Sequence, residues 1–541
     1  MSIQRTLNSM MLGVCLCAWT SSVGHTADAV VVRPASWASH LEDWKQYRAS
    51  QGVQVYEVDA ELGKEGIRQR SRDLKMEHES VQFLLLAGDV TASSTTIPTF
   101  YRDSKAMVQF RGPASIATDN PYADLDDDEI PDLAMGRIPA DSGMQLENVL
   151  RRVVEYEKAN EPSLCQRDVH IVAGVGGFGM LADSVIEMTT KSFLSDRIPG
   201  WSNVSMTQAS TSSNYCPDPR AFDEACIQKF NSGSTFWVYI GHGHVETLDY
   251  LRVTEREFLP ILNVSHLPAL QCNYTKSPIA VFLACYTGAF DSVRDSLAER
   301  LVLKDDGAIA AIAATRVSGP YGLAMLSNGL LNQFYESRVQ TLGEIVHFAK
   351  REMLEGKLQD DAPEQEQAQK PSAQLRMIES IASALSPKDY DLRQERLEHV
   401  WEMHLLGDPL LRPSYPERIA LKVPTRIAPG RQLQVTGHVH SDTDLQVELA
   451  YRRQDLPGDI RRRPVNAESV EGRQAYQGRY ERANAKVISR LNSKRTSGDF
   501  DFTLEVPDDL PRGRYCIRAF GASESGWSTG YAEFTVRPES R

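Results

Sequence analysis

The sequence predicts an α/β fold followed by a smaller all-β domain. From about Ala29 to Tyr335, short apolar runs alternate with segments of helical periodicity. From about Glu417 onward, apolar and polar residues alternate strictly between turns rich in Gly and Pro. A hydrophobic content of 41% and a charged content of 24% are typical of a soluble globular protein. At 541 residues the chain is also too long for a single core.

The first 27 residues are expected to be a cleaved secretory signal peptide. Arg5 precedes an apolar stretch from about Met10 to Trp19, and the small residues Ala27 and Ala29 follow it. This stretch is shorter than the roughly 20 residues that span a bilayer, which argues against an uncleaved anchor. We therefore expect an exported protein that is periplasmic, at the cell surface or secreted, with no transmembrane segment later in the chain.

Residues 28–414 are predicted to form the α/β domain. Short apolar runs separated by helices indicate a mostly parallel sheet with helices on both faces. An acidic, glutamine-rich stretch at about 357–374 is expected to be an exposed insertion. Helical segments are expected to follow it up to His404. The predicted strands are residues 29–33, 53–58, 83–89, 169–174, 236–241, 279–284 and 308–314.

Residues 415–541 are predicted to form a small antiparallel β-sandwich. The stretches "LQVTGHVH", "LQVELAYR", "DFDFTLEV" and "YCIRAF" alternate in polarity as half-buried strands do. The turn signals "APG", "DLPRG" and "SESGWSTG" separate them. No helix is expected in this region.

The net charge and the motifs of the chain argue against nucleic-acid binding and against dinucleotide binding. A net charge of −13 argues against a general binder of nucleic acid, which would need excess Lys and Arg. Residues 174–179, "GVGGFG", satisfy the glycine pattern of a dinucleotide site, but no acidic residue follows a second strand at the required distance. We therefore predict no organic cofactor.

Six cysteines remain once Cys15 and Cys17 leave with the signal peptide. In an exported protein the default expectation for a cysteine is a disulfide. Cys216 and Cys226 are close enough in sequence to form one, although spacing does not fix the pairing. No CxxC pair with a matching second half is present, so a structural zinc site is not expected.

Two predicted strands end at chemically capable side chains. His242 follows "STFWVYI" almost directly, and Cys285 follows "IAVFLA" directly. In open α/β sheets, functional groups collect beyond the carboxyl ends of the strands, so neighbouring strands would bring these two side chains to one crevice. A histidine that takes up the thiol proton would then make Cys285 a nucleophile toward a carbonyl carbon. The glycines beside His242 allow close approach of the backbone to a substrate.

The segments "VYIGHGHVET" and "VFLACYTGAFD" resemble the His and Cys blocks of the gingipain-type cysteine peptidases, which have a caspase-like α/β fold. Further blocks resemble that family in the same order: "VVVRPASWASHLEDWKQYRASQGVQVYEVD", "LLLAGDV" with "IPTFYR", "TDNPYADLDDDEIPDLAMGRIPA", "AIAATR" and "HLLGDPLLRP". The resemblance covers about residues 29–414. The β-sandwich after it is similar to the immunoglobulin-like domain that those enzymes carry.

This resemblance implies specific roles for the two blocks. The catalytic histidine maps to His242 and not to His244, and the nucleophile maps to Cys285. The oxyanion donors map to the backbone N–H groups of Gly243 and Cys285. Some family members orient the histidine with an acid at a position that corresponds to Gly176 here, so either another group orients His242 or the dyad works alone.

The stretch "DLDDDEIPD" places carboxylates at a spacing that suits calcium. A loop with alternating acids can wrap oxygen ligands around the ion, although Glu129 stands where an EF-hand loop has glycine, and no bidentate Glu closes the loop. Because gingipain-type enzymes bind calcium, we expect a structural calcium site. The predicted ligands are Asp124, Asp126, Asp128 and Asp132.

Our prediction is an exported cysteine endopeptidase that acts on protein or peptide substrates through an acyl-enzyme. One alternative is a transpeptidase at the cell surface, in which an amine resolves the acyl-enzyme instead of water. Another is a non-catalytic calcium-binding surface or adhesion protein on the same scaffold. A metal site on His242 and His244 has poor geometry for one tetrahedral ion. Asp183 and Asp291 are the nearest acids for a pocket that would take a basic side chain; the sequence fixes neither cleavage specificity nor oligomeric state.

Overall fold

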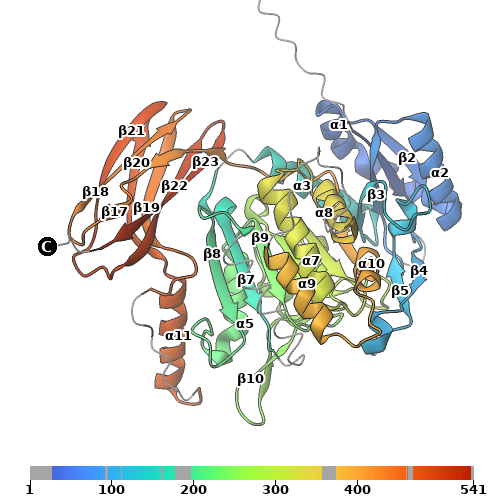
Figure 1. Cartoon of the computed structure of the whole chain (residues 1–541). Coiled ribbons are helices and arrows are strands. Elements are labelled where there is room, and N and C mark those ends of the chain that lie inside the picture. The colour runs from blue at the N-terminus through green and yellow to red at the C-terminus, as the bar shows by residue number, and fades with distance from the viewer. Residues whose placement is uncertain are drawn as a thin grey trace, which may run out of the picture.

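Ten strands form one large sheet in the computed structural model of this chain (Figure 1). The structure describes residues 27–91, 96–110, 112–159, 162–176, 197–355, 373–457, 460 and 467–537. In spatial order the strands are β2 (Val55–Asp59), β1 (Asp28–Arg33), β3 (Val81–Ala87), β6 (Ala134–Ile138), β14 (Met403–Leu406), β13 (Ala310–Ala314), β12 (Ile279–Leu283), β9 (Phe236–Ile240), β7 (Asp168–Ala173) and β8 (Asn203–Gln208).

The sheet consists of two parallel halves that run in opposite directions. We name them the first half (β2, β1, β3, β6 and β14) and the second half (β13, β12, β9, β7 and β8). Neighbours within each half pair in parallel, and the halves meet at the antiparallel pair of β13 and β14. The prediction of a mostly parallel α/β sheet is confirmed. The prediction of helix up to His404 is wrong at its end, because the chain leaves the helix after Glu402 and enters β14.

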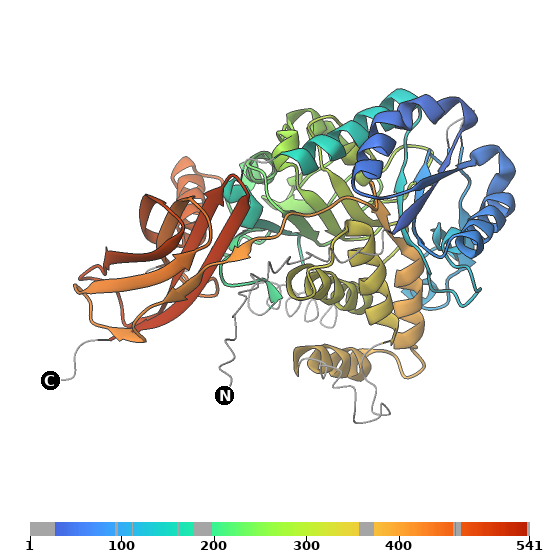
Figure 2. The same ribbon diagram turned by 90° about the horizontal axis from the view of Figure 1, so that it is seen from above.

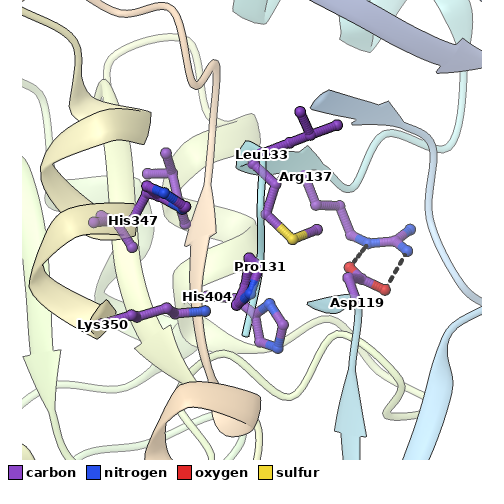
Figure 3. A pocket seen from close by; sticks show the side chains of 11 residues that line it. Asp119, Pro131, Leu133, Arg137, His347, Lys350 and His404 are labelled. Carbon is purple, nitrogen blue, oxygen red and sulfur yellow. Dashed lines mark hydrogen bonds and ion pairs between the residues drawn. The ribbon is translucent and has the colours of Figure 1, made fainter. Parts of the chain in front are cut away.

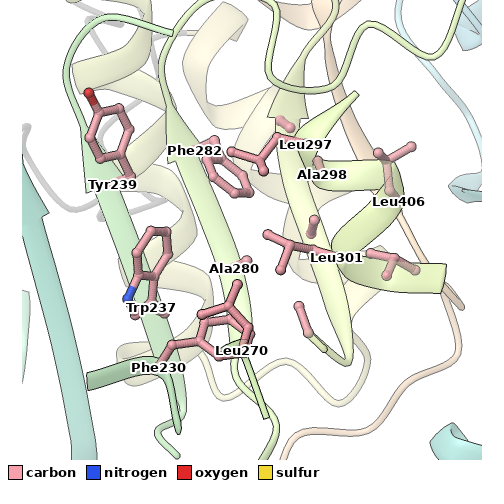
Figure 4. Packing of buried hydrophobic residues seen from close by; sticks show 14 of the residues in the cluster. Phe230, Trp237, Tyr239, Leu270, Ala280, Phe282, Leu297, Ala298, Leu301 and Leu406 are labelled. Carbon is pink, nitrogen blue, oxygen red and sulfur yellow. The ribbon is translucent and has the colours of Figure 1, made fainter. Parts of the chain in front are cut away.

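Helices cover both faces of the sheet because alternate strand residues point to opposite sides. In β12, Ala280 and Phe282 belong to one core cluster, while Ile279, Val281 and Leu283 belong to the cluster on the other face. Figure 4 shows the first of these clusters. The helices are α1 (Glu42–Ser50), α2 (Gly63–Glu77), α3 (Gly143–Lys158), α5 (Phe222–Asn231), α6 (Leu297–Leu303), α7 (Pro320–Leu331), α8 (Leu342–Glu355), α9 (Ala373–Leu385) and α10 (Leu392–Glu402).

Two short hairpins extend from the loops of the sheet. They are β4 (Phe100–Asp103) with β5 (Ser115–Thr118), and β10 (Tyr250–Arg252) with β11 (Phe258–Pro260). The first hairpin packs on the loop after β13, where Thr315 Oγ1 donates to the Ala117 carbonyl at 2.8 Å. Loops of the first half therefore reach the edge of the sheet at which the strands of the second half end.

The region after residue 416 forms two packed sheets of mostly antiparallel strands, with one shared core. One sheet contains β15 (Glu417–Arg418), β17 (Arg426–Ile427), β23 (Gly526–Val536), β22 (Gly513–Ser523), β19 (Thr443–Tyr451) and β20 (Val487–Arg495). The other contains β16 (Ala420–Lys422), β18 (Gln432–Val439) and β21 (Gly498–Glu505). The small β domain is thus present, and its likeness to immunoglobulin domains stays a prediction.

The expectation that this region contains no helix is wrong. Helix α11 (Val470–Asn484) stands between β19 and β20. Its buried Tyr480 lies on β8, where its hydroxyl is 3.0 Å from Thr207 Oγ1. The helix takes its apolar contacts from another part of the chain, which local alternation of the sequence does not reveal. Figures 1 and 2 both place the β-sandwich beside the β8 edge of the large sheet.

Charged groups join the β-sandwich to the α/β region. Glu448 of β19 is fully buried, and its Oε1 accepts a hydrogen bond from Arg167 Nη2 at 2.8 Å. Arg518 Nη2 lies 2.9 Å from the other oxygen. Burial opposes ionisation, but these arginines outweigh it and lower the pKa of Glu448 to about 2. No helix in the described part of the chain is long and apolar enough to cross a membrane.

Candidate active site

The two candidate catalytic residues lie at the same edge of the sheet. Strands β9 and β12 are parallel neighbours, and their last residues, Ile240 and Leu283, are register partners. His242 and Cys285 each follow two residues later. The expectation that these strands are adjacent is therefore confirmed.

The loops that carry these residues are in direct contact. A Cβ atom added to Gly243 would lie 2.6 Å from the Cys285 carbonyl oxygen and 2.9 Å from the Ala284 Cβ. Only glycine fits at this distance. The two residues whose amides are the predicted oxyanion donors, Gly243 and Cys285, are therefore in contact.

Cys285 sits at a sharp turn directly after its strand. Tyr286, the next residue, has a φ of 60°, which a residue with a Cβ adopts only when the surrounding structure holds it there. Its N–H donates to the Arg316 carbonyl at 3.0 Å. The Ser318 N–H points at the thiol, with a distance of 3.4 Å between Ser318 N and Cys285 Sγ.

Cys285 is the one partly exposed cysteine among the six that the structure describes, and the other five are buried. All six are free thiols, so the suggested disulfide between Cys216 and Cys226 is not formed. Cys216, before α5, and Cys226, on α5, are both buried in the same core cluster. A thiol-reactive substrate analogue would meet Cys285 before it met any of the buried five.

The environment of Cys285 keeps its thiol protonated at neutral pH. Burial raises the pKa of this thiol to about 11; the Ser318 N–H lowers it and the nearby Glu402 carboxylate raises it. A nucleophile in this state needs a base that removes its proton as the substrate reacts.

His242 is half-buried, and the backbone around it is fixed. The hydroxyl of Tyr239, a fully buried residue of β9, donates to the His242 carbonyl at 2.8 Å. His244 is exposed, and its N–H donates to the Thr247 carbonyl at 2.9 Å within the turn that follows. The turn therefore directs His244 to the surface, in keeping with the choice of His242.

Asp249, which sequence reasoning considered only as a third ligand of a metal on His242 and His244, lies in the turn that follows His242. Gly243 and Leu248, the residues next to His242 and Asp249, form an isolated antiparallel bridge. The Asp249 N–H donates to the Tyr239 hydroxyl at 3.3 Å, the same hydroxyl that donates to the His242 carbonyl. Asp249 Oδ2 accepts from the Val175 N–H at 3.1 Å, so the carboxylate lies at the end of β7 beside Gly176. The only sequence signal is the Asp at the end of "GHGHVETLD".

Of the two acids suggested for a pocket that would take a basic side chain, the structure describes one. Asp183 lies outside the described residues. Asp291 is held by Arg316, with Nη1 to Oδ1 at 2.8 Å and Nη2 to Oδ2 at 2.5 Å. A basic substrate side chain would have to displace Arg316 from this bidentate pair, so Asp291 is poorly placed for the suggested role.

The acidic loop brings three of its four predicted calcium ligands together. The carboxylates of Asp124, Asp126 and Asp128 offer oxygens that all lie within 4.8 Å of one another, the one such group of possible metal ligands among the described residues. Asp132 Oδ2 instead accepts from the Leu125 N–H at 2.6 Å. Glu129 has a φ of 72° and so adopts the conformation that glycine provides in an EF-hand loop. An all-carboxylate donor set of this kind suits a hard cation such as Ca²⁺.

A separate polar cavity lies between β6, β14 and α8 and is not part of this edge (Figure 3). Its volume of about 10 Å³ holds roughly one water molecule. Lys350 Nζ donates to Asn120 Oδ1 at 3.1 Å at its wall, and burial lowers the pKa of Lys350 to about 7. Neither His242 nor Cys285 lines this cavity. Of the glycine-rich stretch 174–179, residues 177–179 lie outside the described part of the chain.

Comparison with known proteins agrees with this geometry. Residues 22–414 match the model of Peptidase family C25. Lys-gingipain W83 of Porphyromonas gingivalis is 25% identical over 300 residues, which is 53% of this chain and 15% of that protein. The chain therefore spans about 15% of the length of this curated relative.

Two solved structures share the fold. The Arg-specific cysteine proteinase gingipain R (RgpB) has a TM-score of 0.51 at 14% identity, over 95% of this chain and 98% of that one. A structure described only as a protease has a TM-score of 0.53 at 16% identity, over 94% and 97% of the two chains. At these identities the likeness demonstrates the fold alone.

Proposed function

This chain belongs to Peptidase family C25, and from that premise we propose that it is a cysteine endopeptidase with Cys285 as nucleophile and His242 as general base and acid. The observation that supports the assignment most directly is the contact between the two loops. Gly243 packs against the Cys285 carbonyl, and Cys285 is the partly exposed thiol of the six described.

The reaction begins from a neutral thiol. His242 removes the proton from Cys285 Sγ as the sulfur attacks the carbonyl carbon of the scissile peptide bond. The carbonyl oxygen becomes an oxyanion, which the N–H groups of Gly243 and Cys285 stabilise. Collapse of this intermediate breaks the C–N bond, and His242 passes its proton to the leaving amine. A thioester remains between Cys285 and the acyl half of the substrate.

Water completes the cycle. His242 takes a proton from a water molecule as its oxygen attacks the thioester carbon. The C–S bond breaks, a carboxylic acid leaves, and the proton returns to the thiolate. A transpeptidase would use an amine at this point, with the same residues in the same roles.

Asp249 is our candidate for the group that orients His242. It lies in the turn after His242, next to the bridge between Gly243 and Leu248, and its carboxylate accepts from the Val175 N–H beside Gly176. An acid there would favour one ring orientation and stabilise the imidazolium that forms when the thiol loses its proton. This placement would supply from the His242 turn what relatives supply from the end of the preceding strand.

The experiment that tests the assignment is cleavage of a proteome-derived peptide library by the full chain and by Cys285→Ala. We expect cleavage to fall by about 10⁴-fold or more, because the nucleophile is gone. Cys272→Ala is the matched control, a buried thiol whose loss should leave the cleavage rate unchanged. Full cleavage by Cys285→Ala would refute the proposal and favour a non-catalytic surface protein.

Adding an amine nucleophile to the same assay separates hydrolysis from transpeptidation. Hydrolysis yields free carboxylic acids even when the amine is present at millimolar concentration, whereas a transpeptidase yields mainly amide products. The product masses therefore identify the reaction class in the same run that identifies cleavage specificity.

Calcium binding and export are further parts of the proposal. Asp124, Asp126 and Asp128 would hold Ca²⁺ and fix the loop before β6. A rise in melting temperature on adding Ca²⁺, reversed by a chelator and absent in Asp126→Asn, would support the site; an unchanged melting temperature would contradict it. The signal peptide falls on residues outside the described part of the chain and stays a prediction.

A further inference from the structure

Helix α10 presents buried acids to two loops that border the candidate active site. Glu398 is fully buried and well bonded, since its oxygens accept from the N–H groups of Lys105, Ala106 and Met107 at 2.6–3.0 Å. Glu402, one turn later, is also fully buried. Burial raises the pKa of Glu402 to about 7, whereas His399 and the Ser318 side chain favour its ionised form. A buried carboxylate in this state is costly and calls for a cationic partner.

That partner is His399, which the hydrogen bonds require to be a cation. Its Nδ1 lies 2.7 Å from the Glu395 carbonyl oxygen, and its Nε2 lies 3.0 Å from the Gly319 carbonyl oxygen. Carbonyl oxygens only accept, so both ring nitrogens carry a proton and the ring is an imidazolium. Glu402 Oε1 is 3.4 Å from Nε2 and balances this charge. Burial lowers the pKa of His399, but Glu402 and Glu395 outweigh it, and the net effect is a raised pKa.

The pair is connected to the nucleophile through one short turn. His399 donates to Gly319, and the Ser318 N–H before it points at Cys285 Sγ. The Glu402 carbonyl accepts from the Thr315 N–H at 2.9 Å, which anchors the start of the same loop. A Cβ on Gly322 would lie 2.4 Å from His399 Nδ1, so the loop packs directly on the ring.

We propose that Glu402, paired with His399, is a positioning residue for the nucleophile: the pair holds the Ser318–Gly319 turn, whose Ser318 N–H points at the thiol, against Cys285. A negative charge behind this turn would also oppose loss of the thiol proton. The proposal rests on the assignment of Cys285 as nucleophile. The direction of the electrostatic effect agrees with the pKa of the thiol, which burial raises first and Glu402 raises further. Other ionisable groups that face this region are Glu395 and Glu398 of α10, Tyr286 of the nucleophile turn, Tyr390, and His242.

Two effects of opposite sign make the proposal testable. Glu402→Gln removes a negative charge near the thiol, so the pH midpoint of Cys285 alkylation by iodoacetamide should fall by about one unit. Alkylation at pH 7.5 should then be roughly tenfold faster, because the thiolate fraction rises tenfold per unit of pKa. The same variant should cleave peptides more slowly, because the turn loses its anchor. A residue needed only for folding would slow both reactions.

Two control variants separate charge from packing. Glu402→Asp keeps the charge and should retain the wild-type midpoint. Glu398→Gln removes a buried carboxylate of the same helix that bonds the 105–107 loop instead, and should leave the midpoint unchanged. Mass spectrometry of the labelled peptide assigns each rate to Cys285.

A folded Glu402→Gln variant with an unchanged alkylation midpoint would overturn the proposal. If Glu402→Gln does not fold, the pH midpoint of Cys285 alkylation in the wild-type protein provides the test. It should lie above about 8.5, the ordinary pKa of cysteine. A midpoint at or below this value would overturn the proposal. Alkylation needs no peptidase activity. A shifted midpoint together with full cleavage by Cys285→Ala would therefore refute the peptidase assignment and leave the electrostatic effect standing.

Discussion

The two halves of the ten-stranded sheet are built alike, yet their strand ends differ in chemistry. In the first half the polar groups at strand ends bond one another: Arg33 pairs with Glu57 and Asp59, and Arg137 makes a bidentate pair with Asp119. In the second half the strand ends present a thiol and an imidazole that stay partly exposed. A parallel sheet offers several strand ends, and in this chain the two candidate catalytic residues follow the ends of the neighbouring strands β9 and β12.

The backbone at the ends of β12 and β9 is also unusual. The turn after β12 contains a residue with positive φ, and the turn after β9 contains a glycine that touches the neighbouring loop. Such features cost free energy and persist where the surrounding structure holds them. These two turns carry Cys285 and His242, and the ion pair of Arg316 with Asp291 joins the loops after β13 and β12.

The largest expected effect concerns the imidazole of the second half. His242→Ala should lower kcat/KM by about 10³-fold or more, because the thiol loses its base. The matched control is His244→Ala, which removes an exposed ring two residues away and should change kcat/KM less than about threefold. Equal losses for both variants would show that the turn, not the His242 ring, is what matters.

Breaking the main ion pair of the first half should lower the free energy of unfolding without changing kcat. Arg137→Leu leaves the buried Asp119 without its partner and should lower the free energy of unfolding by about 3–5 kcal/mol. Arg33→Leu removes a partly exposed pair of the same half and should cost about 1 kcal/mol or less. Urea unfolding measures both changes. A large fall in kcat for folded Arg137→Leu would contradict the division between the halves.

Asp249→Asn should have an intermediate effect on catalysis. If Asp249 orients His242, the amide should lower kcat by about 10- to 100-fold, or about 1.4–2.7 kcal/mol, with little change in KM. Glu246→Gln alters an acid of the same turn that instead faces Arg294 and Arg300, and serves as the control. Unchanged kcat in Asp249→Asn would leave the dyad working alone.

A last effect, on stability and not on catalysis, is a pH dependence that the two halves share. Burial lowers the pKa of His170 in β7 and of His404 in β14 to about 3 each. Below about pH 6.5 the unfolded chain binds protons at these residues while the folded chain does not, so stability falls as the pH drops from about 6.5 toward 3. The slope should be about 1.4 kcal/mol per pH unit for each histidine.

A single substitution tests whether the buried histidines cause this loss of stability at acid pH. His170→Gln should remove its share of the slope between pH 6.5 and 5, measured as the free energy of unfolding in urea. His244→Gln, at an exposed position, should leave the slope as it is. An unchanged slope in His170→Gln would place the acid sensitivity elsewhere.

Much of the architecture and the core of the site followed from local patterns. Apolar runs identified β1, β2 and β3 of the first half and β7, β9, β12 and β13 of the second, but not β6, β8 or β14. The residues that follow β9 and β12 were the candidates His242 and Cys285. Three features were out of reach because they depend on contacts between distant segments. Helix α11 takes its apolar partners from β8, β14 joins the sheet by pairing with β13, and Arg316 occupies Asp291.

The sequence by itself indicated the alternation of strands and helices and the two strand-end blocks, because each depends on residue types within a few positions; the choice of His242 over His244 came from the family resemblance. The tertiary structure alone decided which charges meet. It placed the Asp249 carboxylate at the end of β7 and brought Glu402, more than a hundred residues away in sequence, to the turn that holds Cys285. Burial and distance set the cost and benefit of each charge, and neither is a property of a residue in isolation.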